Sequence, residues 1–274
     1  MLSVNTNTGA MVALQYLNKT STDLQNTQAR INSGLKVGGP KDNGAVYAIA
    51  QNMRGNVAGY VSVSDSLNRG ISTVDVAISA GQSISDLLNE LKGKALAAAD
   101  ASLDTASRTA LNQDFTALRD QITTIVQNAS FNGTNLVDGT TTDIQALASA
   151  DGSKKITVSG EDLSLSGSIV TISSGASIST ASSASTMVAT INESIQNVNA
   201  SLAKLASGSK KFEIQNDFVS KLVDTLKTGI GNLVDADMAV ESARLQSLQV
   251  KQQLGVQALS IANSAPSITL SLFR

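Results

Sequence analysis

Two pairs of acidic residues come nearest to a catalytic arrangement of side chains. Glu161 and Asp162 are adjacent beside a predicted turn, whereas Asp235 and Asp237 flank the predicted start of a helix. Two neighbouring carboxyl groups can act as a general acid and a general base. The sequence contains no His and no Cys, however, so the commonest catalytic bases, nucleophiles and metal ligands are missing. We interpret both pairs as helix caps and solvated loop charges, and we predict no catalytic residue, no cofactor site and no metal site.

Patterns for binding phosphate, nucleic acid or membranes are equally weak. Residues 36–44, KVGGPKDNG, lack the spacing of a phosphate-binding loop and follow a predicted helix instead of a strand. The net charge is −2 over 274 residues, which does not favour nucleic acid or an anionic membrane as a partner. No segment resembles a transmembrane helix, and the first 18 residues lack the features of a cleavable signal peptide. Assembly remains the main candidate function.

A heptad repeat near the N-terminus predicts the first helix. One heptad position is always apolar, and it is occupied by Ala10, Leu17, Leu24 and Ile31. The second position is half polar, with Leu14, Ser21, Gln28 and Leu35. This pattern is typical of an amphipathic helix with a narrow coiled-coil seam. The run at 38–40, Gly-Gly-Pro, is expected to end this helix, and Asp42 or Asn43 is expected to cap the next one.

Four further helices are predicted from a 3.6-residue period of apolar side chains. The first of them spans about 43–99, a length of roughly 80 Å at about 1.5 Å per residue. The others span about 105–129, about 187–233, and from about Val240 to Pro266. Such lengths predict a mainly α fold, a long antiparallel helical bundle or coiled coil with a small β-hairpin subregion.

Residues 140–185 have a different composition. The segments KKITVSG, EDLSLSG and SIVTISSG predict short strands separated by Gly-marked turns. The dipeptides Asn132-Gly133 and Asp138-Gly139 predict turns just before them. Ser and Thr dominate from Ser164 to Thr186, so a solvated loop and an ordered β-subregion remain equally open.

The two ends of the chain are both amphipathic and nearly uncharged, and we expect them to pack on each other. No charged residue occurs from Gln252 to Phe273. Because a two-helix pair has little core of its own, its other apolar side chains need further partners. The residues predicted to pack in a polymer core are Leu14, Leu17, Leu24, Ile31, Leu35, Val250, Leu254, Leu259, Ile261, Ile268, Leu270, Leu272 and Phe273.

Three segments resemble bacterial flagellins. They are QARINSGLKVGGPKDNGAVYAIAQNMR at 28–54, ASFNGTNLVDG at 129–139, and the last forty residues from DADMAVESARLQ to SITLSLFR. The resemblance implies a structural subunit that is exported unfolded by the flagellar type III apparatus and polymerises into the extracellular filament beneath a cap at the distal tip. It implies terminal segments that are disordered in the free monomer and pair as a coiled coil in the filament.

The same resemblance implies a division into domains and a set of partners. Residues 1–39 with 236–274 would form an inner coiled-coil domain. Residues 40–235 would form a helical rod domain with a β-region at 130–186, and there would be no outer domains. The implied partners are further copies of the chain, the hook-associated junction and cap proteins, and an export chaperone. Three alternatives remain: a hook–filament junction protein, a chemoreceptor-like signalling coiled coil, and a hydrolase that uses an acid pair.

Two finer expectations follow from this resemblance. Glu90, Lys94 and Asp114 align with positions that the flagellin receptor, Toll-like receptor 5, contacts in stimulatory members, where Arg and Leu stand at the first two. A carboxylate in place of Arg reverses the sign of that contact, so weak or no activation is expected. The Ser/Thr-rich region could carry O-glycosylation, at Ser164, Ser166, Thr171, Ser177 and Ser182.

Overall fold

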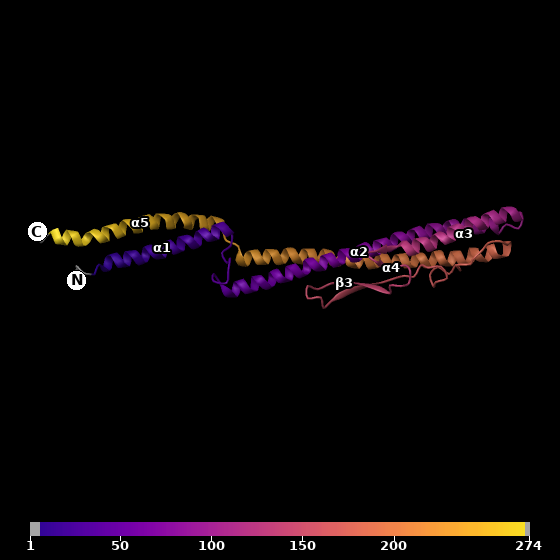
Figure 1. Ribbon diagram of the computed structural model, residues 1–274, viewed down its shortest axis with the longest axis horizontal. Helices are drawn as coiled ribbons and strands as arrows, with labels where there is room; N and C mark the ends of the chain where they lie inside the picture. The colour runs from indigo at the N-terminus through magenta and orange to yellow at the C-terminus, as the bar shows by residue number, and fades with distance from the viewer. Residues whose placement is uncertain (1–5, 272–274) are drawn as a thin grey trace. The chain divides into compact units, whose positions relative to one another are not determined.

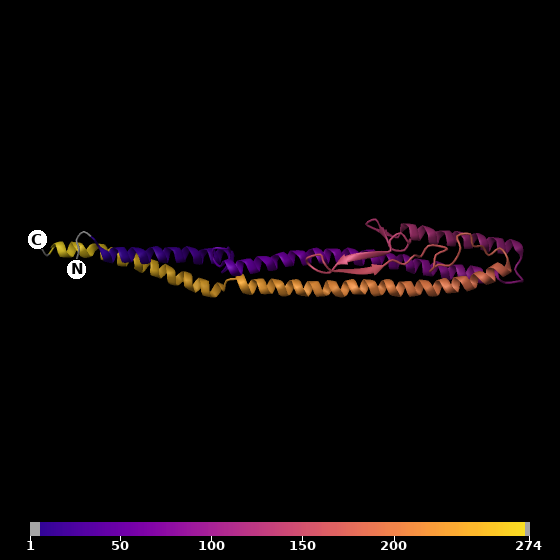
Figure 2. The same cartoon turned by 90° about the horizontal axis from the view of Figure 1, so that it is seen from below.

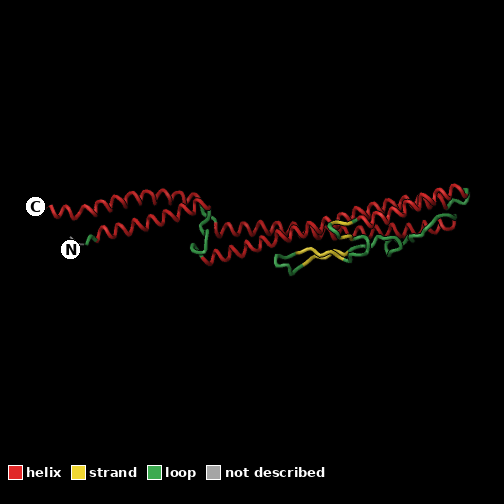
Figure 3. The backbone as a smooth tube through the Cα atoms, viewed as in Figure 1, coloured by secondary structure: helices red, strands yellow, loops and turns green. Residues whose placement is uncertain are grey.

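The computed structural model describes residues 6–271, and of residues 265–271 it describes the backbone alone. Two compact units divide the chain: the end unit, Met1–Gly55 with Thr225–Arg274, and the central unit, Asn56–Asp224. Helices dominate both units (Figures 1 and 3). In chain order the elements are α1 (Thr8–Ser33), α2 (Gly44–Ala98), α3 (Thr105–Asn128), β1 (Ser130–Phe131), β2 (Thr134–Asn135), β3 (Asp143–Leu147), β4 (Lys155–Ser159), α4 (Ala181–Val234) and α5 (Met238–Ser271).

The first helix ends earlier than the Gly-Gly-Pro run at 38–40 predicted. Gly34 takes a left-handed conformation, with φ of 71°, and its N–H donates to the carbonyl of Arg30 over 2.8 Å. Glycine adopts this conformation without steric cost, so it terminates the helix first. Asn43 caps α2 as predicted, since its Oδ1 accepts from the N–H of Val46 at 3.1 Å. Asp42 instead accepts from the N–H groups of residues 38 and 39.

The core of the central unit lies between α2, α3 and α4. α2 and α4 run antiparallel, because Ser64 bonds to Asn216 whereas Asp75, further along α2, accepts from Ser209. The predicted apolar stripes are buried between the helices, and their largest fully buried members include Leu67, Ile84, Leu88, Leu91, Phe115, Ile122, Ile191 and Phe212. The prediction of a mainly α, antiparallel bundle is confirmed.

The β3–β4 hairpin is the larger of the two sheets, and Figure 2 shows it lying along the helices of the central unit. Its strands are antiparallel, with Asp143 opposite Ser159 and Leu147 opposite Lys155. β4 confirms the strand predicted for KKITVSG. β1 and β2 flank Asn132 and Gly133, whose φ angles of 49° and 78° suit a tight hairpin turn.

The segments EDLSLSG and SIVTISSG do not form strands, so these two predictions are wrong. Only an isolated bridge joins Leu165 to Val170. The backbone bonds instead to side chains of the helices: Thr171 N–H donates to Ser194 Oγ at 3.1 Å, and Ile178 N–H donates to Asn112 Oδ1 at 2.7 Å. The segment is nevertheless ordered, because Leu163, Val170, Ile172 and Ile178 are fully buried.

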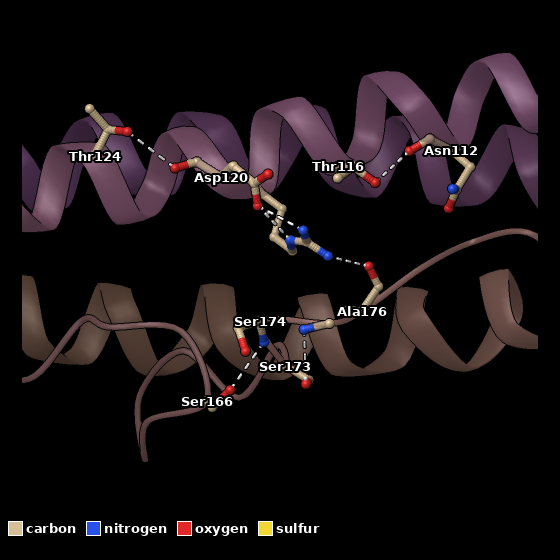
Figure 4. A network of polar contacts seen from close by, with 10 residues as sticks. Asn112, Thr116, Asp120, Thr124, Ser166, Ser173, Ser174 and Ala176 are labelled. Atoms are coloured by element: carbon tan, nitrogen blue, oxygen red, sulfur yellow. Dashed lines mark hydrogen bonds and ion pairs between the residues drawn. The ribbon is translucent and has the colours of Figure 1, made fainter.

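Figure 4 shows how α3 holds this irregular segment. The labelled Asp120 lies on α3, and Ser173, Ser174 and Ala176 lie across from it on the loop. Arg119 Nη1 donates to the carbonyl of Ala176 at 2.7 Å, while its other nitrogens bond to Asp120. Its side chain is only 11% exposed. Arg119 therefore fastens the segment to α3 and satisfies one of its carbonyls.

Asp151 organises the turn between β3 and β4. It accepts hydrogen bonds from the Ser149 hydroxyl and from the N–H and hydroxyl of Ser153. These bonds, the Ser149 hydroxyl above all, lower the pKa of Asp151 from 3.8 to about 2. The ionised form is thus favoured by folding, so its stabilisation is present above about pH 4 and is lost as the pH falls through about 2.

A glycine in α4 lets the β3–β4 hairpin pack closely against this helix. A Cβ at Gly208 would lie 2.5 Å from Cγ1 of Val158, a buried residue of β4 with a stiff, β-branched side chain. We expect Gly208→Ala to lower the free energy of unfolding by about 1–3 kcal/mol. Gly93→Ala, on α2 with nothing within 4 Å of its Cβ, should raise it by about 0.5–1 kcal/mol. Urea unfolding followed by circular dichroism measures both, and a loss of stability in both variants would contradict this account.

Candidate assembly interface

The two terminal helices of the chain, α1 and α5, pack side by side in antiparallel fashion, as Figures 1 and 2 both show. Asn7 bonds to the carbonyl of Ala262 at 2.7 Å, and a Cβ at Gly255 would meet Leu17 Cδ1 at 3.2 Å. Arg30 Nη1 pairs with Glu241 Oε1 at 3.1 Å. The predicted packing of the two ends on each other is confirmed.

At the other end of the α1–α5 pair, the segment after α1 and the segment before α5 are joined by backbone hydrogen bonds. The N–H of Lys36 donates to the carbonyl of Val234, and the N–H of Ala236 donates to the carbonyl of Gly34, both at 2.8 Å. Val37, Ala50 and Val234 form a small buried cluster beside it. The start of α5 is therefore tied directly to the end of α1.

The acidic pairs have structural contacts. Asp237 caps α5 as predicted, because its Oδ1 accepts from the N–H groups of Ala239 and Val240 at 2.9 and 3.1 Å. Glu161 is not a solvated loop charge, so that part of the interpretation is wrong. Its side chain is 10% exposed and accepts from Ser201 Oγ and Lys204 Nζ on α4. Within residues 6–271, no group of three acidic side chains is placed to hold a metal ion.

The predicted packing residues fall into two groups in the end unit. The half-buried group, Leu17, Leu24, Ile31, Leu35 and Leu259, includes the seam of the pair. The exposed group consists of Leu14, Val250, Leu254 and Ile261, with exposures from 47% to 63%. Ile268 and Leu270 lie where only the backbone is described, and Leu272 and Phe273 lie outside the described residues.

The predicted set of packing residues leaves out several exposed apolar residues of the same pair. They are Met11, Val12, Tyr16, Met238, Val240 and Val256. Most of them stand off the heptad seam, so a search for seam positions passes over them. Their own signal is a large apolar side chain outside the heptad positions. The pair therefore presents apolar side chains both inward and outward, which marks a surface for further contacts.

The prediction that α5 ends at Pro266 is wrong, because the helix continues to Ser271. Proline normally interrupts a helix, since it lacks the N–H that would donate to the carbonyl four residues earlier. Here that carbonyl belongs to Ala262, and it accepts a hydrogen bond from Asn7.

The other predicted sites lie in the central unit. Lys94 of α2 forms an ion pair with Asp114 of α3, and Glu90 is exposed on α2. Of the hydroxyls named for glycosylation, those of Ser166, Ser177 and Ser182 belong to exposed residues, whereas Ser164 and Thr171 are half-buried. Among the described helices, none has an apolar stretch of the length and hydropathy needed to cross a membrane.

Two family models match the sequence of this chain. The bacterial flagellin N-terminal helical region matches residues 4–142, and the bacterial flagellin C-terminal helical region matches residues 188–273. Flagellin FljO of Caulobacter vibrioides is 53% identical over 272 residues, which cover 99% of this chain and 98% of that protein. The chain belongs to the bacterial flagellins. Two further relatives, a flagellin of Brucella melitensis and Flagellin C of Rhizobium meliloti, are 37% and 32% identical and are aligned over the full length of both chains.

The family assignment settles the main expectation from the sequence. This flagellin is a structural subunit of the flagellar filament, and the relatives over the whole chain do not favour the junction-protein alternative. It is a short flagellin without a large variable domain, because only residues 143–187 separate the two matched regions. A putative flagellar hook-associated protein from Vibrio parahaemolyticus shares the fold, with a TM-score of 0.60 over 71% of this chain and 100% of that chain at 12% identity.

Proposed function

We propose that the outward apolar side chains of α1 and α5 are buried against neighbouring copies of this flagellin in the filament core. The observation that carries this proposal is the exposure of Leu254 and Ile261, each 63%, on a helix whose opposite face already packs on α1. In this proposal, residues 1–39 and 236–274 form the inner domain of the filament. Residues 40–235, with the β-region at 130–186, form the surrounding shell.

The assembly mechanism that we propose is folding coupled to polymerisation. The stretch from Gln252 to Phe273 carries no charge, so many copies can pack closely without burying an unpaired charge. An end that becomes helical only on joining the filament avoids premature self-association inside the cell. The conformational entropy lost when the ends become helical is then offset by contacts that exist only in the polymer.

A truncated chain tests this mechanism. A variant that lacks residues 261–274 is expected to remain a soluble, helical monomer, because the core of the central unit is untouched. It should fail to grow on filament fragments, as seen by electron microscopy and sedimentation. Normal filaments from this variant would refute the proposed role of the C-terminal segment.

Further parts of the proposal follow from family membership. The chain acts at the cell exterior as a non-enzymatic component, alongside hook-associated junction and cap proteins, after delivery by an export chaperone. Absence of His and Cys supports the non-enzymatic role. The exposed Ser166, Ser177 and Ser182 are better placed for O-glycosylation than the half-buried Ser164 and Thr171. A measured intact mass above 28.2 kDa would support such a modification.

Weak activation of Toll-like receptor 5 is a further prediction. Glu90 presents a carboxylate where stimulatory members have Arg, and Lys94 is held in an ion pair with Asp114. Purified monomer should therefore stimulate reporter cells far less than an enteric flagellin, and Glu90→Arg with Lys94→Leu should raise its potency. Equal potency of the unmodified chain and the enteric flagellin would contradict the prediction.

A further inference from the structure

A proline lies inside α5, which continues five residues beyond it to Ser271. In an α-helix each N–H donates to the carbonyl four residues earlier, so residue 266 would donate to Ala262. Proline has no N–H, and the Ala262 carbonyl is thereby left without its partner within the helix. A carbonyl without a partner weakens the helix where it is partly shielded from water.

The side chain of Asn7 fills this gap from the other end of the sequence. Its Nδ2 donates to the Ala262 carbonyl at 2.7 Å, across 255 residues of chain. Its Oδ1 accepts from the N–H of Ala10 at 3.0 Å and so caps the start of α1. One amide group therefore satisfies an acceptor of α5 and a donor of α1 together.

We propose that Asn7 supplies the hydrogen bond that Pro266 cannot make, and that this bond carries α5 through the proline and fixes the open end of the α1–α5 pair. Among the good capping residues, asparagine alone can both accept from the N–H of Ala10 and donate to the carbonyl of Ala262. Asp offers no donor, and the hydroxyl of Ser is too short to cap α1 and reach a neighbouring helix together. The last turns of α5 are thus coupled to the correct placement of the N-terminus.

A disulfide introduced into this cysteine-free chain reports the pairing directly. A Cβ at Gly255 lies 3.9 Å from Leu17 Cβ, which is within the range of natural disulfides. The full-length chain with Leu17→Cys and Gly255→Cys is grown on filament fragments, so that its end unit is folded, and the bond is then equilibrated in a glutathione redox buffer. The effective concentration of the two thiols in the sedimented polymer then measures how well α1 and α5 pair.

A double-mutant cycle between residues 7 and 266 isolates the proposed bond. Asn7→Ser keeps a helix cap and removes the amide donor, whereas Pro266→Ala restores the missing N–H. With Pro266 present, Asn7→Ser should lower the effective concentration about fivefold, which is the usual worth of one hydrogen bond. With Ala at 266 the same change should lower it by less than about twofold. Asn7→Asp should behave like Asn7→Ser.

The alternatives give different results in the same cycle. An equal fall in both backgrounds would mean that Asn7 acts only as a cap of α1, and it would overturn the proposal. An effective concentration that stays the same in both backgrounds would also overturn the proposal. So would a disulfide that, with Asn7 and Pro266 both present, forms no more readily than one between randomly placed thiols. The inference concerns a bond within one chain and rests on the proposed assembly only for a folded end unit; a chain that forms no polymer would contradict the proposed function, whereas polymer without the expected difference between backgrounds would contradict this inference.

Discussion

Replacement of Leu254 by Glu is expected to stop filament growth while the central unit stays folded. Leu254 is 63% exposed on α5, so the isolated chain tolerates the carboxylate. In the filament, the same group would be buried without a partner, at a cost of several kcal/mol for each subunit. Because about 1.4 kcal/mol corresponds to a factor of ten, the critical concentration should rise at least about tenfold.

Sedimentation of seeded reactions measures this critical concentration, and electron microscopy shows whether filaments are present. Leu254→Met is the matched control, because it keeps an apolar side chain of similar volume and should assemble normally. Thermal unfolding of the central unit should be the same in both variants. Unchanged assembly of Leu254→Glu would mean that this face of α5 stays in contact with water in the filament.

The second large effect concerns two phenylalanines of α4. Phe212 is fully buried, with its ring 3.0 Å from where a Cβ of Gly70 would be, whereas Phe218 is 56% exposed. Phe212→Ala should lower the free energy of unfolding by about 3–5 kcal/mol, because it leaves a cavity in a closely packed core. Phe218→Ala should change it by only about 0.5 kcal/mol.

Urea denaturation of the two variants gives this comparison directly, because the helix and the residue type are the same. The two results together separate packing from local helix propensity. Similar losses of stability in both variants would show that α4 is not packed in solution as the structure has it.

Helix positions were predictable because they depend on local periodicity. The 3.6-residue period over about 105–129 identified α3 from the sequence, and the structure buries Phe115 and Ile122 of this helix fully. The turn at Asn132-Gly133 was also predictable, since few dipeptides accept two positive φ angles. Local rules therefore account for the helices and the tightest turn.

Features that depend on distant residues were not predictable in this way. The segment at 161–180 bonds to Asn112 and Ser194, and nothing in its own sequence names these partners. Pro266 predicts a helix end by itself, and nothing in the sequence around it indicates that Asn7 bonds to the Ala262 carbonyl. The burial of Glu161 likewise depends on donors supplied by α4.

The candidate interface shows the same division. The heptad repeat indicated seam positions such as Leu17 and Leu24, which are half-buried in the pair. It passed over Met11 and Tyr16, which are 57% and 68% exposed, because they are not part of the repeat. That Met11 and Tyr16 are exposed becomes clear only when the structure shows which face of α1 packs on α5. The repeat thus indicated the contact of α1 with α5 at Leu17 and Leu24, although Leu14, a member of the same repeat, is 47% exposed.

The central claim is that the ends of this flagellin fold as it polymerises, and circular dichroism of seeded assembly tests it most directly. The soluble chain is mixed with short filament fragments, and the helical signal at 222 nm is followed together with sedimentation. We predict that helix content rises in proportion to the polymer formed, as the 26 residues of α1 and the 34 residues of α5 become helical. Equal helix content per residue before and after assembly would contradict the claim.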